Sequence, residues 1–170
     1  MSGATARVSV TVAVAPAAAF EIFTRDIDRW WRRGIKFRNA ASNAGFIAVE
    51  PGVGGRLFES FDGERGTHVV EVGRIRLWDP PRMLVFSWRN ANFAPAEHTE
   101  VEVAFSGVAA GTLVTVTHRG LTELRPDHPA RHGLANAPFI RMIGLWWGDQ
   151  MTSLREFSNA NETVTLPDFP

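Results

Sequence analysis

Apolar and polar residues alternate along several stretches of the chain, which is the pattern of strands with one buried face. In Arg7–Val14 four valines fall on one face, and in Glu97–Phe105 Glu100 and Glu102 fall opposite the apolar side. The connection Ser106–Gly111 is short enough for a hairpin, so neighbouring strands are expected to run antiparallel. With the turn residues between them, the pattern predicts five more strands: Phe46–Val49, Arg56–Phe61, Thr67–Trp78, Arg82–Arg89 and Thr112–Arg119.

Two short helices are predicted between the first and second strands. Proline suits the first turn of a helix, because its missing N–H costs nothing there, and this places a helix at Pro16–Thr24. A second short helix begins at Asp26 or Asp28, either of which can cap it, and carries Trp30 and Trp31.

A long helix is predicted near the end of the chain, from Ala137 to about Asn159, with Asn136 as its N-cap. Apolar residues recur on one broad arc of this helix, and polar residues occupy the opposite arc. This apolar face must cover something, and the inner face of the sheet is the large apolar surface that remains. The residues of the arc are Phe139, Met142, Ile143, Trp146, Trp147, Leu154 and Phe157.

The order of these elements predicts an α+β fold. A curved antiparallel sheet of six to seven strands wraps around the long C-terminal helix, and the two short helices follow strand one. With 170 residues and 45% apolar content, residues 1–170 are expected to form a single domain.

Composition narrows the classes of function. The chain has no cysteine, which excludes disulfides, thiolate metal sites and cysteine nucleophiles. Its 18 basic and 18 acidic residues are mixed along the sequence, so nucleic acid is not an expected partner. No stretch is apolar enough to span a membrane, and no secretion signal precedes Arg7, so a cytoplasmic location is expected. Lys36 is the only lysine, a bias that base composition of a genome can also produce.

Five segments, in their order along most of the chain, resemble the START-like or SRPBCC superfamily. Within it, the likeness is to bacterial proteins similar to the C-terminal domain of the activator of Hsp90 ATPase. This resemblance implies a helix-grip (START-like) fold with a hydrophobic tunnel between sheet and terminal helix. The segments are Pro16–Phe23, the pair Trp30-Trp31, the turn from Glu50-Pro51 to Gly54-Gly55-Arg56, the Pro-Pro turn within Gly73–Trp88, and Thr112–Gly120 followed by the tryptophan-bearing helix.

Residues on the inner faces of the predicted strands and helices are candidates for a ligand-binding cavity. Large aromatic side chains fill ordinary cores as readily as they line cavities, so both interpretations stay open. Gln150 lies within the apolar arc, where a buried amide needs either internal partners or a ligand. The candidates are Trp30, Trp31, Trp78, Phe86, Trp88, Val101, Val103, Phe105, Val114, Val116, His118, Ile143, Trp146, Trp147, Gln150 and Leu154.

His118 and His68 are the candidates for acid–base chemistry, since either could act as a general base if a carboxylate such as Glu59 or Glu71 oriented it. A structural role is the alternative for both histidines. His128 and His132 are four residues apart, but the sequence between them contains a proline and shows no third ligand. We therefore predict no metal and no cofactor.

Three functions remain open, because this fold serves carriers, enzymes and co-chaperones alike. The preferred hypothesis is that the chain binds a small hydrophobic or aromatic molecule in the cavity, without catalysis. The second is an enzyme of cyclase, hydratase or hydrolase type that uses a cavity histidine. The third is an interaction module for an Hsp90-type ATPase, although the chain has no room for the separate N-terminal domain of the eukaryotic activator. A homodimer is also left open by the sequence.

Overall fold

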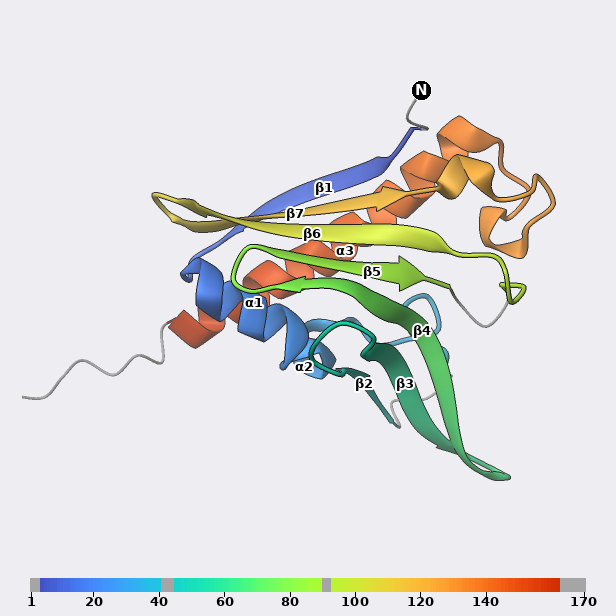
Figure 1. The fold of residues 1–170 in the computed structure, drawn as a ribbon, viewed down its shortest axis with the longest axis horizontal. Helices are drawn as coiled ribbons and strands as arrows, with labels where there is room; N and C mark the ends of the chain where they lie inside the picture. Colours follow the sequence, from blue (N-terminus) through green and yellow to red (C-terminus); the bar gives the residue numbers. More distant parts are fainter. Residues whose placement is uncertain (1–3, 41–44, 90–92, 163–170) are drawn as a thin grey trace, which may run out of the picture.

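The computed structural model describes residues 4–40, 45–89 and 93–162. They form a seven-stranded antiparallel sheet of order β1-β7-β6-β5-β4-β3-β2, with a long helix, α3, across one face (Figure 1). The strands are β1 Ala6–Val12, β2 Phe46–Val49, β3 Arg56–Gly63, β4 Gly66–Asp79, β5 Met83–Trp88, β6 Thr99–Val108 and β7 Gly111–Arg119. The helices are α1 Pro16–Thr24, α2 Ile27–Trp30 and α3 Asn136–Glu162, with short 3-10 helices η1 Leu121–Glu123 and η2 Pro129–Arg131.

The alternation in sequence becomes the two faces of the sheet. Val103 in β6 lies opposite Val116 in β7, and both are fully buried on the face that meets α3. Strand β1 pairs with β7, so the first strand of the chain lies beside the last one. This continuous pairing confirms the predicted antiparallel sheet.

Helix α3 lies across the concave face of the sheet, and its buried side chains close the main core. Trp147, Met151 and Leu154 are almost inaccessible to solvent, at the spacing expected for one face of a helix. The rings of Phe20 and Phe23 from α1 pack against Phe105 at centroid distances of 5.2 and 5.9 Å. The predicted helix-grip α+β fold is therefore confirmed.

Some element ends differ from the sequence prediction. Helix α3 begins at Asn136 itself, whose side-chain oxygen accepts a hydrogen bond from the Arg131 guanidinium at 2.7 Å instead of capping the helix. Trp31 lies just beyond the last residue of α2, and β6 continues to Val108, which pairs with Gly111. Since the final turn of a hairpin and the first residue of a helix depend on neighbours outside the local pattern, these ends are the least predictable parts.

None of the helices among the described residues is both long enough and apolar enough to cross a membrane.

Candidate ligand-binding cavity

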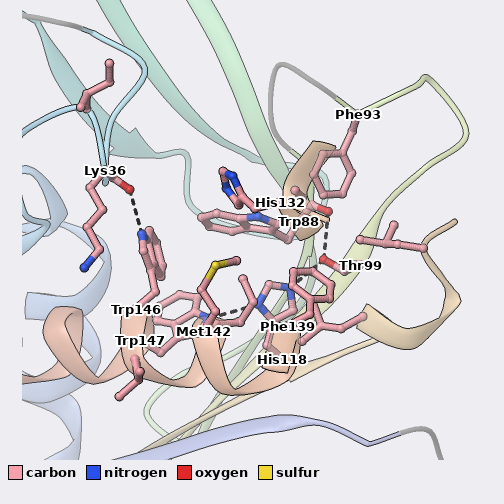
Figure 2. Close-up of a pocket in the computed structure, with 16 residues that line it drawn as sticks. Lys36, Trp88, Phe93, Thr99, His118, His132, Phe139, Met142, Trp146 and Trp147 are labelled. Carbon is pink, nitrogen blue, oxygen red and sulfur yellow. Dashed lines mark hydrogen bonds between the residues drawn. The ribbon is translucent and has the colours of Figure 1, made fainter. Parts of the chain in front are cut away.

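A cavity of about 610 Å³ lies beneath the first half of α3. Its walls come from the ends of β5 and β7, the start of β6, the connection through η1 and η2, and the loop that follows α2 (Figure 2). The cavity reaches the surface, because two of its lining residues, Ile35 and Leu145, are 83% and 65% exposed. Its volume falls within the range of small-molecule sites.

Four tryptophans pack together at one wall of the cavity. Trp88, Trp146 and Trp147 line the cavity, and Trp31 packs behind them. Every pair among the four is in ring contact, with centroids 5.0 to 6.0 Å apart. Three of the indole N–H groups donate hydrogen bonds within the protein, so their rings are held in fixed orientations.

His118, at the end of β7, is buried against this wall with both ring nitrogens bonded. Its Nδ1 accepts from the indole N–H of Trp147 at 3.1 Å, and its Nε2 lies 2.6 Å from the hydroxyl oxygen of Thr99. An indole only donates, so the proton of the neutral imidazole is on Nε2 and is donated to Thr99. The Thr99 hydroxyl in turn donates to the backbone oxygen of Trp88 at 3.3 Å.

Burial lowers the pKa of His118 from its ordinary value of 6.5 to about 3. The side chain is therefore neutral at physiological pH, and its remaining lone pair is already engaged by Trp147. This arrangement orients Trp147 and Thr99. It leaves no free nitrogen with which His118 could take a proton from a ligand.

The loop after α2 is fixed to α3 and forms the outer wall. The indole N–H of Trp146 donates to the backbone oxygen of Lys36 at 2.9 Å, and the backbone N–H of Arg32 donates to Gln150 Oε1 at 3.0 Å. Lys36 Nζ also lies 3.1 Å from a carboxylate oxygen of Asp149. The mouth of the cavity is thus built by contacts between this loop and one turn of α3.

A buried arginine holds the same loop from behind. The guanidinium of Arg38 binds the Asp28 carboxylate at 2.6 Å and the backbone oxygen of Trp31 at 2.7 Å. Although burial raises the pKa of Asp28, hydrogen bonds from Arg38 and from the backbone N–H of Ile47 bring it below its ordinary value. Glu59, one of the carboxylates considered as a partner for a catalytic histidine, instead accepts backbone N–H bonds from this loop.

The opposite wall is held by Arg131 and His128, which are both buried. Arg131 donates to the backbone oxygen of Leu124 at 2.6 Å, and its guanidinium lies over the ring of Phe139, 5.2 Å from the centroid. His128 packs edge-on against Phe93 with centroids 4.5 Å apart, and its Nδ1 accepts from a backbone N–H in η2. These contacts position the apolar lining residues on this side.

The structure divides the predicted cavity residues into two groups. Five of the sixteen candidates line the cavity: Trp88, His118, Ile143, Trp146 and Trp147. The other eleven pack in or against the main core, namely Trp30, Trp31, Trp78, Phe86, Val101, Val103, Phe105, Val114, Val116, Gln150 and Leu154. Of these, Gln150 is fully buried, and its Nε2 has no partner among the described residues.

Eleven lining residues were not among the predicted ones. Thr99, Phe139 and Met142 lay on apolar faces that the sequence pattern had identified, so alternation and helical periodicity could have found them. The remainder come from loops and 3-10 turns with no periodic signal, or from the polar margin of the helix. They are Ile35, Lys36, Phe93, Leu121, Leu124, Ala130, His132 and Leu145.

The three other histidines considered from the sequence do not converge on one site. His68 is exposed on β4, where its ring stacks on Phe61 with centroids 5.5 Å apart, well away from the cavity lining. His128 is buried and His132 is exposed, so the pair spaced four apart does not converge. Within the described residues, no three histidine or carboxylate side chains come together as a metal site would require.

Comparison with known proteins agrees with this architecture. The family model described as Activator of Hsp90 ATPase homolog 1-like protein matches residues 13–137. A solution structure from Cytophaga hutchinsonii aligns with a TM-score of 0.66 at 11% identity, covering 96% of this chain and 99% of that one. Protein MLL2253 from Mesorhizobium loti aligns with a TM-score of 0.61 at 16% identity, covering 96% and 100%.

A further solution structure, described as the Aha1 dimer from Colwellia psychrerythraea, aligns with a TM-score of 0.59 at 15% identity. It covers 92% of this chain and 97% of that one. No curated protein matched the sequence. At such low identities, the solved structures establish the shared fold.

Proposed function

The chain belongs to the Activator of Hsp90 ATPase homolog 1-like family, and from this premise we propose that it binds a small molecule with an aromatic or apolar body in the cavity beneath α3. Family membership alone leaves the activity open, because one fold hosts many functions. The proposal therefore rests on the cavity itself.

The observation that carries the proposal is the group of aromatic side chains facing this space. Protein interiors are normally packed with few voids larger than a water molecule. Here Trp88, Phe93, Phe139, Trp146 and Trp147 all border a cavity of about 610 Å³. Large rings that border open space, instead of filling it, support the binding of an apolar body that covers them.

The polar groups of the cavity favour binding over acid–base catalysis. Both nitrogens of His118 are engaged inside the protein, and its low pKa keeps it neutral. Thr99 already accepts and donates a hydrogen bond, so it is a positioned hydroxyl and lacks a base that would activate it. We propose a binding protein on these grounds.

The test uses naphthylmethanol as a neutral aromatic probe and Ala130→Phe as a variant that fills the cavity. Ala130 lines the wall, so a phenylalanine there occupies space that the probe needs. Calorimetry should show saturable binding to the wild type and binding weakened about tenfold or more in Ala130→Phe. The matched control is Ala137→Phe, an exposed position outside the lining, which should bind as the wild type does.

Two results would contradict the proposal. One is the absence of saturable binding of naphthylmethanol to the folded wild type. The other is equal weakening by both phenylalanine variants, because that would place the probe outside the cavity.

The family description and the Colwellia structure favour a second candidate, an interaction with an Hsp90-type ATPase in the cytoplasm, with the chain acting as a homodimer. Addition of the purified protein to the Hsp90 homologue of its host should then raise the rate of ATP hydrolysis. An unchanged rate, with both proteins folded, would remove this candidate, and sedimentation velocity would decide between monomer and dimer.

A further inference from the structure

We infer that the ligand of this cavity is an aromatic carboxylate, whose ring lies against the tryptophans and whose anionic group is bound by Lys36 at the mouth. This inference rests on the proposed binding function and names the chemical class of its ligand. It is based on the cavity lining, which contains a lysine and no carboxylate among the described residues, and on the position of Lys36, the only lysine in the chain.

No aspartate or glutamate belongs to the cavity lining in the described part of the chain. Lys36 is the only lysine or arginine in the lining, and His132, also a lining residue, can donate a hydrogen bond from a ring N–H. His118 contributes no charge, since burial keeps it neutral. The wall is therefore suited to an anion and has no countercharge for a cationic ligand.

The backbone of Lys36 is held beside the aromatic wall, whereas its side chain makes only exposed contacts, with the Asp149 carboxylate and the ring of Phe37. Its backbone oxygen accepts the hydrogen bond from Trp146, which fixes the residue at the rim (Figure 2). The side chain is 63% exposed, and Figure 2 shows its ammonium group directed away from the tryptophan rings of the cavity, while it lies 5.3 Å from the ring centroid of Phe37. Rotation of the long flexible side chain can bring the ammonium over the mouth.

The present partner of Lys36 is exchangeable. Its ion pair with Asp149 is 3.1 Å long, and the Asp149 side chain is 50% exposed. Exposed ion pairs are weak, because water screens the charges and two flexible side chains must be ordered. With a ligand carboxylate held in place by the cavity, only the lysine side chain must be ordered, so this carboxylate can replace Asp149 as the partner of Lys36.

The location at the mouth also fixes the orientation of the ligand. A carboxylate deep among the tryptophans would lose its hydration without a compensating charge, which is strongly unfavourable. At the rim it remains partly hydrated and lies within reach of the ammonium group. The ring therefore enters first and the carboxylate stays at the opening, beside the exposed residues Ile35 and Leu145.

The experiment compares naphthoate with neutral naphthylmethanol, which has the same ring system. The measured quantity is the preference for naphthoate, defined as the ratio of the two dissociation constants at one salt concentration. We expect the wild type to prefer naphthoate and Lys36→Gln to reduce this preference about fivefold. Asp149→Asn releases Lys36 from its ion pair and should raise the preference about twofold.

The matched control is Arg155→Gln, which removes one positive charge from an exposed position of α3 outside the cavity lining. It should leave the preference unchanged. Binding of naphthylmethanol by each variant shows that its cavity is intact. An unchanged preference in Lys36→Gln, with naphthylmethanol still bound, would overturn the inference and leave the proposed function standing. Failure of naphthylmethanol to bind the folded wild type would overturn both.

A second measurement uses the fact that the chain has one lysine. Acylation of Lys36 by an amine-reactive ester can be followed by mass spectrometry of the peptide that contains it. Saturating naphthoate should slow this acylation about threefold or more relative to saturating naphthylmethanol, because a carboxylate held by the cavity protects the amine more strongly than the exposed pair with Asp149 does. Equal acylation rates with the two bound probes would count against the contact.

Discussion

At the scale of single residues, the cavity wall depends on one chain of hydrogen bonds. Trp147 donates to His118, His118 donates to Thr99, and Thr99 donates to the backbone oxygen of Trp88. These four residues come from α3, β7, β6 and the end of β5, so the series of hydrogen bonds connects the helix to three neighbouring strands. The imidazole is neutral and both its nitrogens are hydrogen-bonded. His118 therefore fixes the orientations of Trp147 and Thr99.

This role predicts how stability depends on pH. In the unfolded chain His118 takes up a proton below its ordinary pKa of 6.5, whereas in the folded protein it stays neutral down to a pKa of about 3. The unfolded state therefore binds more protons in this window, and the free energy of unfolding falls as pH decreases from 6.5 toward 3. At pH 5 the loss from this one group is about 2 kcal/mol.

The measurement is urea unfolding of wild type and His118→Gln at several pH values. Glutamine has no titrating group in this range, so the variant should show a shallower fall in stability between pH 6.5 and 4, whatever its stability at neutral pH. His68→Gln is the control, because His68 is exposed outside the cavity lining. A slope for His118→Gln equal to that of the wild type would contradict a neutral, buried His118.

At the scale of elements, the strands and α3 were predictable because their signal is local. Alternation in β6 and β7 identified the buried face, and the arc of α3 identified Trp147 and Leu154 as facing the core. Helical periodicity does not distinguish core from cavity wall, since it reports only a side of the helix. Leu154 packs in the main core, whereas Ile143, on the same arc, borders the cavity, and the difference depends on what lies opposite.

The connection between β7 and α3 decides where the cavity lies, and its sequence has no period. Residues 120–135 include two 3-10 turns held by the buried Arg131, which donates to backbone oxygens of η1, to that of Leu124 just after it, and to Asn136. A buried arginine that binds backbone carbonyls has no sequence signature, because the same residue type is usually exposed. For this reason the sequence identified the long helix but not the second wall of the cavity.

Helix α3 contains glycines that nothing in the packing requires, and this predicts a stabilising substitution. A Cβ placed on Gly144 would meet no atom within 4 Å, and glycine is a poor helix former because its unfolded state has high backbone entropy. Gly144→Ala should therefore raise the free energy of unfolding by about 0.5–1 kcal/mol and the melting temperature by about 2 °C.

Gly73 in β4 is the comparison position, because here the same substitution should lower the stability. A Cβ there would lie 1.8 Å from the backbone oxygen of Ser87, so Gly73→Ala must displace a neighbouring strand and should destabilise the protein by about 2 kcal/mol or more. Thermal unfolding followed by circular dichroism distinguishes the two variants. A lower melting temperature for Gly144→Ala would show that α3 has a packing requirement at this position.

At the scale of the whole molecule, the cavity lies at the junction of two apolar clusters. The main cluster joins the sheet, α1, α2 and the second half of α3. A smaller satellite cluster joins Phe93, Leu121, Leu124 and Phe139. Trp88 and Ile143 pack against both clusters and also line the cavity. The satellite cluster thus lies beside the cavity without being part of the main core, and we expect it to open locally while the sheet remains folded.

This division predicts a gradient of amide hydrogen exchange and a local response to the ligand. The strands β7, β6 and β5, which are paired on both sides, should exchange slowest, and residues 120–135 faster, because the latter rest on the smaller cluster. Naphthylmethanol fills the space between residues 120–135 and the first turns of α3, and it should therefore slow exchange in both segments. The exposed hairpin at residues 61–69 lies outside the cavity lining and should be unaffected. Uniform slowing over all these segments would indicate that the clusters open only together with the sheet, and slowing confined to 61–69 would place the probe elsewhere.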